Sequence, residues 1–84
     1  MATNHFIHVT DVKYLDGYRL RVSFDDNVTK IVDLAPELWG EIYEPLKDVE
    51  FFKRVSINPD FKVLCWPNEA DFATDAIYDM GVAV

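Results

Sequence analysis

Apolar and polar residues alternate along the first third of the chain with a period of two, which is typical of antiparallel strands. Between residues 18 and 24 every second side chain is apolar, while Arg19 and Arg21 fall on the opposite face. This pattern predicts a strand with one buried and one solvated face. Residues 6–14 and 28–34 are similarly apolar, and turn-forming residues at 15–17 and 25–27 separate the three segments. The first part of the chain therefore predicts a three-stranded antiparallel meander.

Two irregularities interrupt the alternation. Val9 and Val12 lie an odd number of residues apart, which predicts a bulge at residues 10–11 or a strand that begins later. In the third strand Val32 and Ile31 fall on opposite faces, so the alternation leaves open which face is buried.

The middle of the chain predicts short helices. Pro36 suits the first turn of a helix that Gly40 ends, and residues 41–45 are expected to form a loop or a frayed turn. Asp48 is a suitable N-cap for a second short helix over residues 48–54. Neither segment is long enough to be stable alone, so both helices must be held by packing.

The last third predicts a β-hairpin followed by a helix. Residues 55–57 form a short strand, and residues 61–66 return as a fifth strand that is apolar on both faces and therefore central. Thr74 is predicted to cap a helix over residues 75–80, with Gly81 as its C′ residue. The last three residues form a loose end or pair with an open sheet edge.

The resulting order, β-β-β-α-β-β-α, is that of an α+β fold. We expect one small two-layer domain over residues 1–84, with a meander, short helices, a β-hairpin and a C-terminal helix. A chain of 84 residues needs a rich apolar inventory to bury a core, and six Phe, four Tyr and two Trp supply it.

Charge and cysteine content limit which partners the protein is expected to bind and in which cellular compartment it is expected to lie. Fifteen acidic residues against eight basic ones give a net charge of −7, which opposes binding of nucleic acid by the chain on its own and favours a basic protein partner. Cys65 is the single cysteine, which excludes an internal disulfide or a multi-cysteine zinc site, and we expect a small buried thiol suited to the reducing cytoplasm. The sequence shows no signal peptide and no apolar segment of the roughly 20 residues that cross a membrane.

The polar residues predict no catalytic group, cofactor or metal site. His5 and His8 would lie on opposite faces of a strand, and residues 25–27 lack the glycine and glutamate of a calcium loop, so they are predicted to form a hairpin turn. Asp71 and Asp75 recur at helical spacing and are interpreted as solvated carboxylates. The alternative is a small-ligand-binding or metal-assisted enzyme that uses these two groups.

Five residues are candidates for a binding interface. Arg19 and Arg21, together with Lys13, could form a small basic stripe on the solvated face of the meander, and Asp71 is the main chemical handle near the C-terminus. Exposed tryptophans anchor interfaces, whereas buried ones fill cores. We interpret Trp66 as a core residue with an interface as the alternative, and Trp39 remains open between the two roles.

Several segments together resemble a family of small bacterial proteins, domain-of-unknown-function family 2442. The shared features are Val32–Asp33–Leu34, residues 45–48 running into Phe52, and residues 66–72 followed by Ile77–Tyr78. Glu69 stands where the family pattern has glycine, which argues against a turn with positive φ there.

The resemblance implies a small α+β fold without an established activity or family catalytic residues. The resemblance also implies that members stand beside another small protein, in an arrangement similar to toxin–antitoxin pairs. Some members carry an added helix-turn-helix segment, which we expect to be absent here. The predicted function is therefore a non-enzymatic, cytoplasmic protein-interaction or regulatory module, an antitoxin-like partner of a small basic protein.

Overall fold

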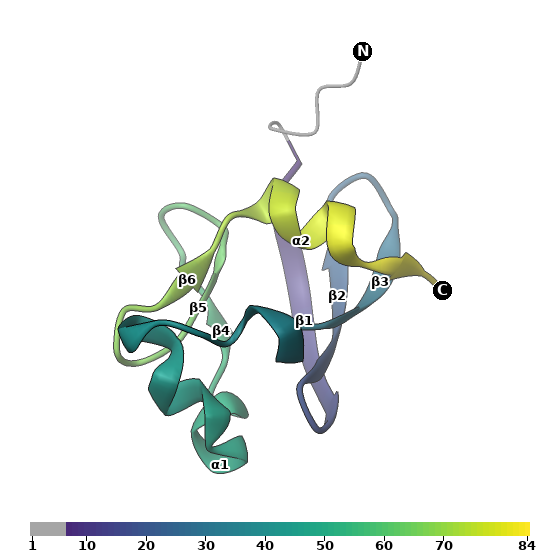
Figure 1. Cartoon of the computed structure of the whole chain (residues 1–84). Helices are drawn as coiled ribbons and strands as arrows, with labels where there is room; N and C mark the ends of the chain where they lie inside the picture. Colours follow the sequence, from purple (N-terminus) through teal and green to yellow (C-terminus); the bar gives the residue numbers. More distant parts are fainter. Residues whose placement is uncertain (1–6) are drawn as a thin grey trace.

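The computed structural model describes residues 7–84, which fold into two antiparallel sheets that share one core (Figure 1). One sheet has the strand order β1-β2-β3-β7 and the other the order β4-β5-β6. The strands are β1 (Val9–Asp16), β2 (Arg19–Phe24), β3 (Thr29–Asp33), β4 (Ser56–Ile57), β5 (Leu64–Cys65), β6 (Asp71–Phe72) and β7 (Val82–Ala83). The α+β class predicted from the sequence is confirmed.

The meander forms as its alternation predicts. The strand β1 begins at Val9, and residue 6, where the apolar segment starts, lies outside the described residues. The pairing of β1 with β2 shifts between Val9 and Asp11, where the bulge was expected. The two turns use residues with positive φ, Gly17 at +47° and Asn27 at +68°, because tight hairpins need the left-handed conformation that these residue types tolerate.

The pairing of β2 with β3 settles which face of the third strand is buried. Leu20 pairs with Val32, and both side chains are fully buried. Ile31 therefore points to the solvated face of the sheet, where it pairs with Val82 of β7.

The predicted fifth strand over residues 61–66 is wrong in its length. The side-chain oxygen of Asn58 accepts the N–H groups of Asp60 and Phe61, and Lys62 has a φ of +58°, so the chain stays in a loop until Leu64. The central place of this strand is confirmed, because β5 lies between β4 and β6. The strand β6 was not predicted.

The middle segment is helical over shorter stretches than expected. The predicted helix over residues 35–40 is a single 3₁₀ turn, η2 (Ala35–Glu37), and the predicted loop over residues 41–45 belongs to a 3₁₀ helix, η3 (Glu41–Lys47). The N-cap at Asp48 is confirmed, since its carboxylate accepts the N–H of Glu50 at 3.1 Å and begins α1 (Val49–Phe52).

Two predictions at the C-terminal helix are wrong. Helix α2 (Thr74–Met80) has Ala73 as its N-cap, and the Thr74 hydroxyl donates instead to the Lys62 carbonyl. Gly81 has an extended backbone rather than a left-handed one, and a Cβ there would lie 2.8 Å from Cβ of Lys30. Glycine is thus required for close packing. This close packing lets the next residues pair as β7 with β3. Of the two alternatives predicted for the last three residues, pairing with an open sheet edge is therefore correct and a loose end is wrong.

The core lies between the two sheets, and α1, η3 and α2 close it (Figure 1). Cys65 is only partly buried, contrary to expectation, with Sγ 3.5 Å from the Ser56 hydroxyl. The buried apolar residues are Val9, Leu20, Val22, Phe24, Val32, Leu34, Leu38, Leu46, Phe52, Leu64, Trp66, Ala70 and Ile77.

The turn after Trp66 contradicts the expectation drawn from Glu69, because this residue does have a positive φ, at +71°. A left-handed conformation costs a non-glycine residue roughly 1–2 kcal/mol, and a glycine at the same position avoids this cost. Part of the gain is offset, because glycine has more conformational freedom to lose from the unfolded chain. We therefore expect Glu69→Gly to raise the free energy of unfolding by about 0.5–1 kcal/mol, measured by urea denaturation. Asn27→Gly is the matched control and should change stability less, since asparagine tolerates this conformation. A destabilised Glu69→Gly protein would contradict the argument.

Candidate interaction surface

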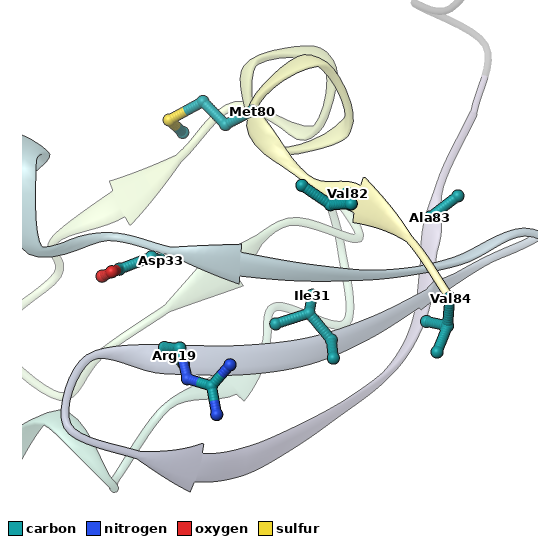
Figure 2. A pocket seen from close by; sticks show the side chains of 7 residues that line it. All are labelled: Arg19, Ile31, Asp33, Met80, Val82, Ala83 and Val84. Carbon is teal, nitrogen blue, oxygen red and sulfur yellow. The ribbon is translucent and has the colours of Figure 1, made fainter.

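An open cavity of about 420 Å³ lies at the end of the four-stranded sheet, on its solvated side (Figure 2). Residues of β2, β3 and β7 and the end of α2 form its walls, and most of their side chains are apolar. In the view of Figure 2 the side chain of Ile31 lies between those of Arg19 and Val84. The lining residues are Arg19, Ile31, Asp33, Met80, Val82, Ala83 and Val84.

Strand register explains why these residues meet. Two residues of the lining, Arg19 of β2 and Asp33 of β3, pair directly. Ile31 of β3 pairs with Val82 of β7 on one side and with Arg21 of β2, which is not part of the lining, on the other. Cross-strand neighbours on one face of a sheet lie about 4.5–5.5 Å apart, so this row of three side chains is continuous. The row joins a basic end of the sheet to an apolar one.

Arg19 is held in place by an ion pair rather than presented as a free cation. Its guanidinium donates two hydrogen bonds to the Asp16 carboxylate, at 2.8 and 3.0 Å. This hydrogen bonding raises the pKa of Arg19 and lowers the pKa of Asp16, and the negative charge of Asp33 raises the pKa of Arg19 slightly further. Arg21 and Lys13 pair across β1 and β2, and neither forms an ion pair with any residue between 7 and 84, so the remaining charge of the predicted basic stripe lies there.

The outer edge of β7 is open within residues 7–84, because β7 pairs with β3 and with no other described strand. Val82 and Val84 are 72% and 74% exposed. Natural proteins protect such edges by keeping the edge strand very short or with charges, proline or a bulge. The strand β7 is two residues long, and the side chains of residues 82–84 include no charge and no proline. A short edge without charged side chains beside an apolar cavity is a surface onto which another strand can pair.

The two tryptophans have opposite environments. Trp66 is 3% exposed, and its indole N–H donates to the Phe52 carbonyl at 2.9 Å, so it is a core residue and the interface alternative for it is wrong. Trp39 is 71% exposed and follows η2. It does not line the β7 cavity, and its role as an interface residue stays a prediction.

The carboxylates considered for an enzyme do not converge. Asp71 lies in β6 and Asp75 in α2, and they line different hollows. The Asp75 carboxylate accepts the N–H of Ala76 at 2.9 Å. Within residues 7–84, no group of three His, Cys, Asp or Glu residues is arranged to hold a metal ion.

The remaining polar motifs are structural. Residues 25–27 form the predicted hairpin turn, and Asp25 accepts hydrogen bonds from the backbone and ring of His8, the residue before β1, which lower the pKa of Asp25. Tyr78 donates to Asp26 at 2.6 Å, and this hydrogen bond raises the pKa of the phenol. His5 lies outside the described residues.

Sequence reasoning found Arg19 but missed the apolar part of this surface. The available signals were Ile31, which breaks the alternation of its strand, and the uncharged side chains of the last three residues.

In the part of the chain that the structure describes, no helix is long and apolar enough to cross a membrane.

Comparison with known proteins identifies relatives but no activity. A family described as "Protein of unknown function (DUF2442)" matches residues 9–83. The crystal structure of a Nitrosomonas europaea protein named "Putative DNA Binding Protein" is similar, with a TM-score of 0.80 and 29% sequence identity. The match covers 95% of this chain and 52% of that one, so the chain spans about half the length of that protein. No curated protein matches the chain.

Proposed function

The chain belongs to the DUF2442 family of proteins of unknown function, and from its surface and charge we propose that it is a non-enzymatic module that binds another protein. The observation that carries the proposal is the open, uncharged edge of β7 beside an apolar cavity. In such sites the partner adds a strand to the sheet, main-chain hydrogen bonds supply affinity, and pockets for alternate side chains supply specificity.

The partner is proposed to be a small basic protein. A net charge of −7 attracts a basic partner at long range and raises the rate of association at low salt. An antitoxin-like pairing with a basic neighbour protein fits this chemistry. We place the pair in the cytoplasm, where the partly exposed Cys65 thiol stays reduced.

DNA binding is not proposed for this chain on its own. The name of the Nitrosomonas europaea protein refers to that whole protein, of which this chain matches about half. Nucleic-acid affinity depends on neutralising phosphates with Lys and Arg, whereas Arg19 is already paired with Asp16 and acidic residues outnumber basic ones.

The proposal predicts that a partner contacts β7. With a photo-cross-linking amino acid at Val84, we expect one basic protein of the native host to be captured, and not when the same group replaces Glu50, which is equally accessible on α1. In a binding measurement with that purified protein, Val82→Asp should weaken affinity about tenfold or more, because it places a charge in the apolar contact.

Glu50 also supplies the control for the binding measurement. Glu50→Gln, at a side chain that is 82% exposed, should bind the partner as tightly as the wild type. Equal capture from positions 84 and 50, or wild-type affinity of the Val82→Asp variant, would remove the β7 edge as the binding surface.

A further inference from the structure

A second exposed apolar surface surrounds Phe61, in the loop between β4 and β5. The Phe61 side chain is 73% exposed. Together with Val63 and Ala73 it lines two hollows, one of about 240 Å³ and one of about 320 Å³. We call Phe61, Val63 and Ala73 the Phe61 surface.

The loop holds Phe61 in its exposed position. The side-chain oxygen of Asn58 accepts the N–H groups of Asp60 and Phe61 at 2.8 and 3.0 Å, and the Asn58 carbonyl accepts the N–H of Lys62 at 2.8 Å. The Lys62 carbonyl in turn accepts hydrogen bonds from the Thr74 hydroxyl and from the backbone of β1. An aromatic side chain on a loop braced in this way loses little conformational freedom when a partner binds, which favours its use as an anchor.

Each hollow beside Phe61 carries one aspartate. Asp75 lines the smaller hollow and Asp71 the larger one. Lys62 lines a third hollow, so its ammonium does not neutralise these two carboxylates from within either hollow. His8 lines both the third hollow and the smaller one, and its ring is paired with the Asp25 carboxylate. The Phe61 surface therefore combines an apolar centre with a negative rim.

We propose that the Phe61 surface binds a basic, extended segment of a partner protein that places one apolar side chain in each hollow, on either side of the Phe61 ring. Alternate side chains of an extended segment point the same way and lie about 6.6–6.8 Å apart, which allows two of them to flank one ring. Lysines or arginines at the next positions on the same face, two residues before and two residues after this apolar pair, reach Asp71 and Asp75. This surface would be a second contact with the partner, in addition to the β7 edge. The inference rests on the proposed function only in its assumption that the partner is a protein.

The test uses a defined peptide and the full chain. In a titration followed by NMR of the ¹⁵N-labelled protein, the peptide Lys-Gly-Leu-Gly-Leu-Gly-Lys, whose leucines and lysines share one face when it is extended, should shift the amides of residues 61–63 and 73–75 saturably. Glu-Gly-Leu-Gly-Leu-Gly-Glu, which has the wrong charge, and Lys-Gly-Gly-Gly-Gly-Gly-Lys, which lacks apolar side chains, should not.

Variants then separate the anchor from the charges. Phe61→Ala should lower the affinity for the first peptide about tenfold, and Phe61→Leu should lower it less. Asp71→Asn and Asp75→Asn should each reduce its salt dependence, whereas Glu50→Gln should not. Because Phe61 is exposed, we expect Phe61→Ala to remain folded, and its thermal melt verifies this.

Two results would overturn the inference, and they bear differently on the proposed function. Shifts confined to β7 would place basic segments at the sheet edge, in agreement with the proposed function but against the Phe61 surface. Absence of saturable shifts, or equal shifts with the acidic peptide, would reject the Phe61 surface, while cross-linking from Val84 still decides the proposed function independently.

Discussion

The variant Phe52→Ala is expected to lose about 3–5 kcal/mol of unfolding free energy. Phe52 is fully buried, and its ring centroid lies 5.3 Å from that of Tyr18, 6.1 Å from Tyr14 and 5.6 Å from Trp66. Alanine removes one partner of all three ring contacts and leaves a cavity where α1 meets the meander. Chains of this size are stable by roughly 4–13 kcal/mol in total, so a large part of the stability is lost.

The measurement is urea denaturation followed by far-ultraviolet circular dichroism. Phe51→Ala is the matched control, since Phe51 is the adjacent residue of α1 and is only partly buried. It should cost clearly less. A Phe52→Ala variant that is as stable as Phe51→Ala would show that α1 does not anchor the core.

The second large effect is expected for Trp66→Phe. The substitution keeps an aromatic ring but removes the indole N–H that donates to the Phe52 carbonyl. The Phe52 carbonyl then keeps only its longer hydrogen bond, from the Val55 N–H at 3.3 Å. The lost indole hydrogen bond and the smaller buried side chain together cost about 2–3 kcal/mol.

Trp39→Phe provides the matched comparison for that variant. The same chemical change at a side chain that is 71% exposed should alter stability by less than about 0.5 kcal/mol. Both variants are compared with the wild type by the same denaturation measurement. Equal effects at the two positions would mean that the Trp66 hydrogen bond contributes nothing to stability.

The meander could be predicted because the residue pattern that specifies it is local in the sequence. Every second residue from Leu20 to Phe24 is buried, and alternation with turn residues at Gly17 and Asn27 reports directly on which face is buried. The N-cap at Asp48 was predictable for the same reason, since a cap requires only the residues that follow it.

The second sheet was less predictable because long-range contacts define it. The apolar pattern over residues 61–66 suits a strand, yet the Asn58 side chain takes up the N–H groups that a longer strand would use in its ladder. Strands of two residues, such as β6, carry no periodicity of their own. The turn at Glu69 was excluded on residue type, although its N–H donates to the Trp66 carbonyl at 2.9 Å and helps to hold the turn.

The candidate surface at β7 was only half visible in the sequence. Arg19 and Arg21 follow from alternation on the solvated face, but the apolar half requires β7 to pair with β3. That pairing depends on the close approach of Gly81 to Lys30, which joins residues about fifty positions apart in the chain. No local pattern reports such an approach.

The uncharged edge of β7 also bears on the colloidal behaviour of the protein. Near neutral pH each copy carries a net charge of −7, and this repulsion opposes edge-to-edge association of one copy with another. Carboxyl groups become protonated as the pH falls towards about 4, so the repulsion fades while the exposed edge remains. The acidic composition thus keeps the protein dispersed, and mildly acidic buffers at high concentration favour its aggregation through β7.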